Sequence, residues 1–561
     1  MVWMLDGGKW CQCERCQALG SQTDRNLLFV YHYDQAIKRA QAEGRINRPV
    51  RLLFLAYADV LEPPTRPLPA DFDYDTCIAT YFPIVRCYVH NFDDPDCSKN
   101  AAYNKALLGW ATDPGRYYKG QVCIGEYYNV SGYKCLPVCY MHTMANDIPY
   151  YYGLGVRHFH YMHCTTANWG NKALTNYQMA RQLWDPRTDC SALWTDYLAG
   201  RYGPVQAEMR TFYGHLEKML CNVSKLKYGL ARRLDTGAAN LFPTTHLKYG
   251  RTTFEKDDGP DLLEILAYAK QCRETLDAIA KQDLPERIAQ RVAEDERLFT
   301  YGERTVQFYD ALCRAYEAAR QSVSDQSDKS DQSDKSDQSD RARAAFRQAE
   351  ALADLLKADT TSTKLSSSHA SAANGLVASY AQGALLRLQS LLGPMAPKEV
   401  KLLGANGTPL VLTGEECLGG GGVLHGYGFD VYPARKRVSE HGNYVYGQGT
   451  PADRLTGWFR LGDVPAGGLT LTLYGIKCPR PPGGEVAGEI RVNENLVFGA
   501  RVPLTETGLT RWDLLVSAAA LKPGLNRLEI RNTEPNGVTS NRPWFGIDRV
   551  ELRETADGPA P

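Results

Sequence analysis

The feature that most constrains the fold is the alternation of short apolar runs with helix-like stretches over residues 1–190. Each run is apolar over about four to seven residues, as is typical of parallel strands that are buried on both faces. Between the first and second of these runs, residues 25–43 carry apolar side chains at helical spacing. This alternation predicts a parallel α/β domain. The expected strands are Val2–Leu5, Arg51–Tyr57, Thr76–Tyr81, Gln121–Gly125 and Val156–Met162.

The strand count predicts only part of a TIM-type (β/α) barrel in residues 1–190, because a closed barrel needs eight strands. The start, MVWMLDGGKWCQC, has no basic residue before its apolar stretch and does not indicate a signal peptide. We therefore expect the chain to begin inside a domain, with upstream sequence supplying the remaining strands. No apolar run is long enough to predict a membrane span.

Two further regions differ from the first in composition and in the spacing of their apolar residues. Residues 191–395 show consecutive amphipathic patterns and predict a helical region. Within it, residues 324–340 repeat the hexapeptide SDQSDK without an apolar residue, which predicts a disordered insertion. Residues 396–561 are rich in Gly and Pro and contain short alternating segments, which predict an antiparallel, jelly-roll-like β-sandwich. The expected fold class is thus a multidomain chain of α/β, all-α and all-β parts.

Composition narrows the class of partner. The 64 basic and 64 acidic residues cancel, and this balance argues against a general nucleic-acid binder. The 33 Tyr, 16 Phe and 9 Trp offer rings with polar tips, which suit the C–H face and hydroxyls of a sugar. The alternative is that tyrosines fill large cores and rims.

One carboxylate stands out in the segment GQVCIGEYYN. Glu126 ends an expected strand and is followed by Tyr127 and Tyr128. A lone Glu beside aromatic rings can have its pKa raised by desolvation, as a general acid for glycosidic oxygen requires. The alternative is a salt-bridged Glu at a barrel rim.

Polar residues that follow the other expected strands are further candidates, since catalytic groups of parallel α/β barrels lie at strand carboxyl ends. Asp6 could bind a substrate hydroxyl, or could simply shape the Gly-Gly turn after it. Tyr57 lies at a strand end. One polar loop carries Arg86, His90, Asp94 and Asn100. Arg86 and His90 could bind hydroxyls or a carboxylate; the alternative is a loop held by its own Asx turns.

The segment GLGVRHFHYMHC carries three histidines. On a strand, His158 and His160 would share a face. We expect them to pack in a core or barrel layer, with a metal site as the alternative. His163, near the strand's end, is the histidine we assign to the substrate site.

Of the 16 cysteines, 11 lie in residues 1–190. Cys11, Cys13 and Cys16 could hold a structural zinc ion with a fourth ligand from elsewhere. Disulfides to Cys87 or Cys97 are the competing explanation, and buried thiols are a third. No other cofactor is expected.

Six motifs follow one another along residues 1–215: DGG-x-WC-x-C-x-x-C, LAYADVLEPP, RCYVHNFDDPDC-x-x-N, GEYYN, LP…DI-x-YYYGLGVRHFHY and LWDP…YLAGRYG. Taken together, they resemble a bacterial family known as domain of unknown function 4838, which is glycoside-hydrolase-like and distantly similar to α-glucuronidases. The resemblance implies a TIM-type barrel with a helical extension, in proteins that are secreted or periplasmic. It implies sugar chemistry at Asp6, Arg86, His90 and Glu126. The final strands also resemble galactose-binding-like β-sandwiches.

The leading hypothesis is a glycoside hydrolase acting on polysaccharide or oligosaccharide bonds. Glu126 would be the general acid, and Asp6 or Asp94 would be the base or nucleophile. Tyr57, Arg86, His90, Tyr127 and His163 would bind the substrate.

The alternative hypothesis is a non-catalytic carbohydrate-binding protein with a degenerate barrel. Its sandwich would hold glycans on Trp458, Tyr427 or Trp544. A third hypothesis is a metal-dependent enzyme that uses the thiol cluster. The sequence leaves the oligomeric state open.

Overall fold

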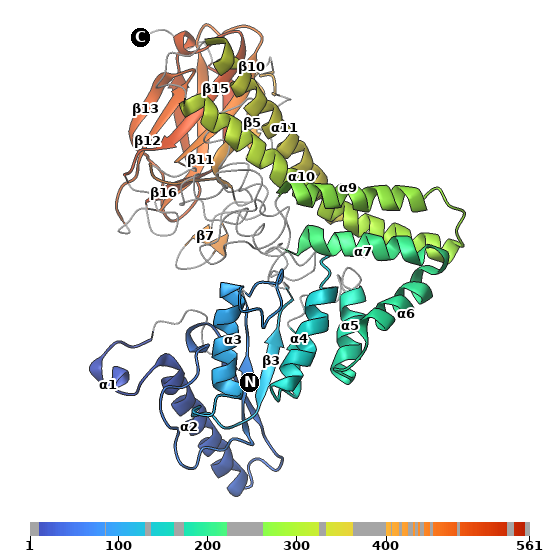
Figure 1. The fold of residues 1–561 in the computed structure, drawn as a ribbon. Coiled ribbons are helices and arrows are strands. Elements are labelled where there is room, and N and C mark those ends of the chain that lie inside the picture. The colour runs from blue at the N-terminus through green and yellow to red at the C-terminus, as the bar shows by residue number, and fades with distance from the viewer. Residues whose placement is uncertain are drawn as a thin grey trace. The chain divides into compact units, whose positions relative to one another are not determined.

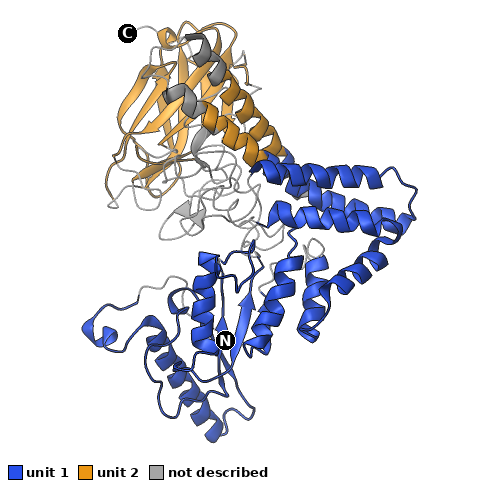
Figure 2. Ribbon diagram, viewed as in Figure 1, with its two compact units in different colours: residues 1–227, 247–307, 355–377 blue, residues 228–246, 308–354, 378–561 orange. Residues whose placement is uncertain are grey.

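The computed structural model describes fifteen stretches of the chain, and its elements fall into two compact units (Figures 1 and 2). Unit 1 comprises residues 1–227, 247–307 and 355–377, and unit 2 comprises residues 228–246, 308–354 and 378–561. The described residues are 10–84, 86–128, 136–161, 173–221, 262–324, 332–362, 400–404, 407–413, 418–423, 430–431, 436–437, 443–448, 453–478, 483–535 and 543–555.

A four-stranded parallel sheet organises the first part of unit 1, with strand order β1-β2-β3-β4. Four of the expected strands are confirmed, each shifted by at most two residues at its start. The expected strand Val2–Leu5 lies outside the described residues. The closed barrel stays a prediction. The strands are β1 (Leu52–Ala56), β2 (Cys77–Tyr81), β3 (Val122–Glu126) and β4 (His158–Tyr161).

Helices α2 (Gln22–Ala42), α3 (Ser98–Ala111) and α4 (Met141–Gly153) accompany this sheet. Ser21 and Asp24 form a reciprocal capping box at the start of α2, which explains where that helix begins. The core beside the sheet contains residues from all three helices and from alternate strand positions. It includes Leu27, Val30, Phe54, Ala79, Tyr81, Leu107, Trp110, Val122, Ile124 and Tyr151.

Helices make up most of the described chain between the two sheets. Helices α7 to α11 lie within the expected helical region and α6 begins one residue before it, but part of the hexapeptide repeat is not a disordered insertion, because α11 already begins at Gln332. The repeat has no Gly or Pro, so the helix that follows can extend back through it. The repeat's residues 325–331 lie outside the described residues. The helices are α5 (Ala173–Trp184), α6 (Cys190–Tyr202), α7 (Gln206–Leu220), α9 (Leu262–Ile279), α10 (Glu286–Ser324) and α11 (Gln332–Ser362), with the short α1 (Glu14–Gln17), η1 (Ala58–Val60) and η3 (Gly203–Val205).

Unit 2 contains the expected antiparallel β-structure. Its described strands form a ten-stranded sheet, and a separate two-stranded ladder joins β7 to β8. The strands are β5 (Leu410–Thr413), β6 (Leu418–Val423), β7 (Asp430–Val431), β8 (Lys436–Arg437), β9 (Asn443–Val445), β10 (Asp453–Leu461), β11 (Leu469–Cys478), β12 (Ala487–Val492), β13 (Asn495–Arg501), β14 (Thr510–Val516), β15 (Gly524–Asn532) and β16 (Trp544–Glu554), with the short η6 (Ala518–Ala520).

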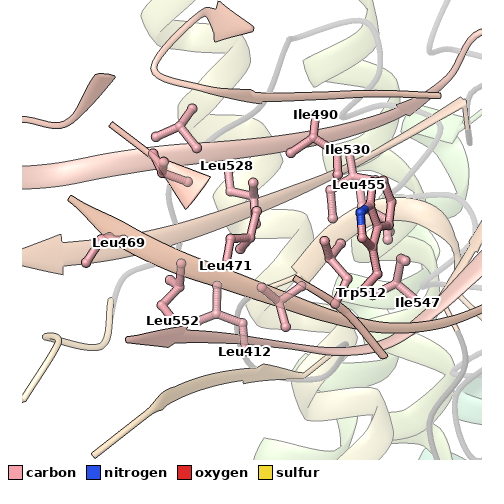
Figure 3. Close-up of a cluster of buried hydrophobic side chains, with 14 of the residues drawn as sticks. Leu412, Leu455, Leu469, Leu471, Ile490, Trp512, Leu528, Ile530, Ile547 and Leu552 are labelled. Carbon is pink, nitrogen blue, oxygen red and sulfur yellow. The ribbon is translucent and has the colours of Figure 1, made fainter. Parts of the chain in front are cut away.

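The two halves of this sheet enclose one apolar core (Figure 3). Alternate residues of β11, such as Leu469 and Leu471, point into it, as the period of two predicts for strands with one buried face. The core also contains Leu412, Leu455, Ile490, Trp512, Leu528, Ile530, Ile547 and Leu552. The arrangement is that of a β-sandwich. Among the described residues, no helix is both long and apolar enough to cross a membrane.

Candidate functional site

Strand β3 presents two different faces. Side chains alternate along a strand, so Val122, Ile124 and Glu126 point to one face and Gly125 and Tyr127 to the other. Val122 and Ile124 belong to the core that the helices share. Glu126 therefore points toward the helices, and its side chain is fully buried. The predicted position of Glu126 at the carboxyl end of a strand is confirmed.

Glu126 is one member of a buried ion-pair network. The Nε atom of Arg86 lies 2.9 Å from Oε1 of Glu126, and an Nη atom of Arg86 pairs with Oδ2 of Asp147 on α4. All three side chains are 0% exposed. Oδ1 of Asp147 accepts a hydrogen bond of 2.9 Å from the backbone N–H of Phe92. The expectation of a lone carboxylate at this strand end is therefore wrong.

Two tyrosine hydroxyls and two backbone amides, those of Tyr127 and Tyr128, also donate to Glu126. The hydroxyl of Tyr88 donates to Oε2 at 2.7 Å, and that of Tyr151 donates to Oε1 at 2.9 Å. The backbone N–H of Tyr127 also donates to Oε2, at 2.8 Å. The guanidinium carbon of Arg86 lies 4.3 Å from the centre of the Tyr88 ring, as in a cation–π contact.

The network holds one guanidinium and two carboxyl groups, all fully buried. Burial raises the pKa of Asp147 to about 6, although the attraction of Arg86 acts in the opposite direction. Burial likewise raises the pKa of Tyr88 and of Tyr151 well above the usual value, and the charge of Glu126 adds to this. Both phenols are thus neutral hydrogen-bond donors. The side chains of the network bind and orient one another, and neither carboxylate faces solvent.

The other face of the sheet carries a ring cluster near the carboxyl ends of the strands. We define the ring cluster as Tyr57, Phe82, Tyr127 and His160. The Phe82 ring centre lies 6.2 Å from that of Tyr57, 5.9 Å from that of Tyr127 and 5.8 Å from that of His160. Tyr57 is partly exposed and His160 is exposed, so the cluster reaches solvent.

Glycine at position 125 makes this cluster possible. A Cβ atom at Gly125 would lie 2.0 Å from the Phe82 ring and would clash with it, because non-bonded atoms do not approach so closely. The two faces of β3 are also linked directly, since Glu126 holds the backbone amide of Tyr127 while the Tyr127 ring lies on the opposite face. Glu126 can therefore position a ring that it does not touch with its own side chain.

The remaining predicted residues fall in different places. Arg86, which as a whole residue is 1% exposed, belongs to the buried network. His90 is partly exposed, and its Nδ1 lies 3.4 Å from the sulfur of Cys87. Asp94 accepts the backbone N–H of Asp96 at 2.9 Å, as the Asx-turn alternative predicts. Asp6 and His163 lie outside the described residues.

The histidines of β4 correct another expectation. His158 and His160 share a face as predicted, but both are exposed and neither packs in a buried layer. The strand lies at the end of the described strand order, β1-β2-β3-β4, so in the described part of the chain only one of its sides has a strand neighbour.

The thiols of Cys11, Cys13 and Cys16 do come together. Their sulfurs lie within 4.8 Å of one another, and those of Cys11 and Cys13 are 3.4 Å apart. Hydrogen bonds that the Cys16 thiol donates to Cys11 and Cys13 raise the pKa of Cys16 to about 11. The structure draws these three thiols, and those of Cys87 and Cys97, without a disulfide.

Sequence reasoning missed Asp147 and Phe82. Asp147 and Tyr151 are four residues apart on α4 and so share a face of that helix, which is the only local signal for the pair. Phe82 directly follows β2, one position beyond the expected strand, and its place beside Gly125 depends on strand register.

In unit 2, aromatic rings gather on β9 and β16. The rings of Tyr444 and Tyr446 are inclined by 10° with centres 6.1 Å apart, and the Trp544 ring lies 4.8 Å from that of Tyr444. All three are partly exposed. Trp458 lies on β10 and is partly exposed, and Tyr427 lies outside the described residues.

Comparison with protein families confirms the resemblance found in the sequence. Residues 2–214 match the model of the family described as domain of unknown function (DUF4838). No curated protein matches the chain.

Several solved structures show distant similarity. One is a family GH115 4-O-methyl-α-glucuronidase with specificity for decorated arabinogalactans; it is 12% identical with a TM-score of 0.31, and the match covers 90% of this chain and 58% of that one. Another is the CBM36-1 domain of a multidomain xylanase from the hindgut metagenome of Trinervitermes trinervoides, at 12% identity and a TM-score of 0.18, covering 28% of this chain and 99% of that domain. A family 35 carbohydrate binding module from Clostridium thermocellum is 12% identical with a TM-score of 0.17, covering 26% and 97%.

Proposed function

We propose that this chain recognises carbohydrate at the ring cluster of its parallel sheet. The observation that carries the proposal is a solvent-accessible group of rings at the carboxyl end of the strands, on the face opposite the helices. Substrates of parallel α/β barrels bind at this end. Rings such as Tyr57 and His160 offer an apolar surface with polar atoms beside it, which suits the alternating C–H and O–H groups of a sugar.

In this proposal Glu126 is a positioning residue. Its carboxylate fixes the backbone of Tyr127 and is itself held by Arg86, Tyr88 and Tyr151. A site gains affinity when its contact groups are rigid before the ligand arrives. The network would thus keep one ring of the cluster in place without touching the sugar.

The test is binding of the full chain to an array of plant and algal glycans. We expect binding by the unchanged protein and a loss of at least tenfold in His160→Ala, whose exposed side chain can be removed without opening a core. Tyr33→Ala is the matched control, because Tyr33 is 47% exposed on α2 and lies outside the cluster. Equal loss in both variants, or no glycan bound at all, would refute the proposal.

Glycoside hydrolysis is the second candidate, favoured by the position of a carboxylate at the carboxyl end of β3. Glu126 would be the general acid, with Asp6 or Asp94 as the second carboxylate. For Glu126 to reach a glycosidic oxygen, its pairing with Arg86 and its tyrosine bonds would have to open. Release of reducing sugar from the bound glycans, abolished in Glu126→Gln, would establish this function.

We further propose a structural zinc ion at Cys11, Cys13 and Cys16, with the fourth ligand from elsewhere in the chain. The closeness of the three sulfurs supports it. By family resemblance, we also propose a secreted or periplasmic location.

A further inference from the structure

A second group of metal-ligand side chains lies in the loop between β2 and α3. It consists of Cys87, His90 and Cys97, and we call it the loop triad. Its ligand atoms all lie within 4.8 Å of one another. The Cys87 sulfur is 3.4 Å from Nδ1 of His90. In a tetrahedral zinc site with usual bond lengths, sulfur and nitrogen ligands are about 3.5 Å apart.

A single buried side chain holds this loop in shape. Asn100, which is 0% exposed, accepts the backbone N–H of Cys87 at 2.9 Å. Its amide donates to the carbonyls of Cys87 at 3.0 Å, His90 at 3.1 Å and Asn91 at 2.9 Å. Asn100 lies in the first turn of α3, three residues after Cys97, which occupies the N-cap position of that helix. The same residue therefore fixes all three members of the triad relative to one another, as supporting residues do around metal ligands.

We propose that Cys87, His90 and Cys97 bind a zinc ion. Two thiolates and an imidazole are ligands that zinc favours, and three protein ligands leave the fourth position to water or to another ligand. A disulfide between Cys87 and Cys97 would engage only the two sulfurs, whereas a metal ion engages all three side chains. Both cysteines are buried and His90 is partly exposed, so an ion could enter from the histidine side.

The triad is joined to the buried network through the backbone. Cys87 stands between Arg86 and Tyr88, and both of these contact Glu126. A zinc ion on Cys87 would restrain this segment and thereby stabilise the network. Removing the ion would lower the melting temperature of the part of unit 1 that contains α4. This inference does not depend on carbohydrate binding.

The experiment measures zinc content in the full chain, purified with reductant and then dialysed against zinc and against metal-free buffer. The variant Cys11→Ser/Cys13→Ser/Cys16→Ser removes the other thiol group, so any zinc that it retains must bind elsewhere. In that background we expect one zinc per chain, lost in His90→Ala and in Cys97→Ser. Cys123→Ser is the matched control, because Cys123 is buried on β3 outside the triad.

Three results would overturn the inference, two of them zinc contents. One is a zinc content that His90→Ala and Cys97→Ser leave unchanged, and the other is a chain that takes up no zinc in the triple-variant background. A Cys87–Cys97 disulfide found by peptide mass spectrometry in the zinc-loaded protein would also overturn it. Since His90 is partly exposed, His90→Ala should fold even if Cys97→Ser does not, and its zinc content alone decides the question.

Discussion

The two faces of the parallel sheet in unit 1 have opposite chemistry within one strand. On the helix-covered face, β3 ends in Glu126, which is fully buried among Arg86, Tyr88 and Tyr151. On the other face, one residue further on, the Tyr127 ring joins a cluster that includes the exposed His160. The difference shows that a polar residue at a strand end can point to the face opposite the proposed binding site and act on that site only through the backbone. A residue next to a site residue in the sequence can therefore have its side chain outside that site.

The largest effect should come from removing the cation of the buried network. In Arg86→Ala, Glu126 and Asp147 lose their shared partner, and we expect unit 1 to lose about 3–5 kcal/mol of stability. Calorimetry of the full chain measures this, and hydrogen exchange of peptides from α4 assigns the transition. Arg187→Ala, whose side chain is 89% exposed, is the control. A loss below 1 kcal/mol would mean that the network does not hold this face together.

The second effect concerns pH. Asp147 has a pKa raised to about 6 in the folded chain because it is buried, whereas an unfolded Asp has a pKa near 3.9. The folded state therefore keeps this proton while the unfolded state releases it. Stability should fall as pH rises from about 4 to about 6, by up to 1.4 kcal/mol per unit, and should then level off.

Asp147→Asn tests that assignment, because it removes the titrating group while keeping a polar side chain. Denaturant midpoints of the full chain between pH 4 and 7 should show less decline in the variant than in the unchanged protein. The same decline in both proteins would assign the titration to other groups.

The third prediction tests the packing of the ring cluster against β3. In Gly125→Ala, the new Cβ meets the Phe82 ring at 2.0 Å, so the ring must move. We expect a loss of about 1–3 kcal/mol, as overpacking usually costs, together with weaker glycan binding. Gly153→Ala is the control, because nothing lies within 4 Å of a Cβ there. Unchanged binding in a folded Gly125→Ala protein would separate Phe82 from the site.

The smallest effect is that of one hydroxyl. Tyr151→Phe removes one hydrogen bond to Oε1 of Glu126, which keeps its contact with Arg86. We expect a loss of about 1 kcal/mol in the same calorimetric transition. Tyr152→Phe, with a 45% exposed ring on the same helix, should change stability by less than about 0.5 kcal/mol. Equal effects would show that the bond to Glu126 contributes nothing of its own.

Much of the fold could be predicted from local patterns. Strand β11 (Leu469–Cys478) lies in the region of short alternating segments, and β1 to β4 follow from their apolar runs. The hexapeptide repeat was harder, because the absence of apolar residues predicts disorder while the absence of Gly and Pro permits a helix.

The face of Glu126 could not be assigned from sequence. Both faces of β3 are apolar, so the alternation of Val122, Cys123 and Ile124 does not tell which face the helices cover. Its partner Arg86 lies 40 positions earlier, and the two meet only because β2 and β3 are adjacent in the sheet. Residue spacing carries no signal for such a pair.

Glycan binding by Glu126→Gln and His160→Ala, compared side by side in the full chain below the melting temperature of both, tests the central claim most directly. The account predicts that a folded Glu126→Gln protein keeps binding within a few-fold, since Gln can still accept the Tyr127 amide, while His160→Ala loses it. Loss of binding and of sugar release in Glu126→Gln, with His160→Ala unaffected, would contradict the account and place Glu126 in the active site.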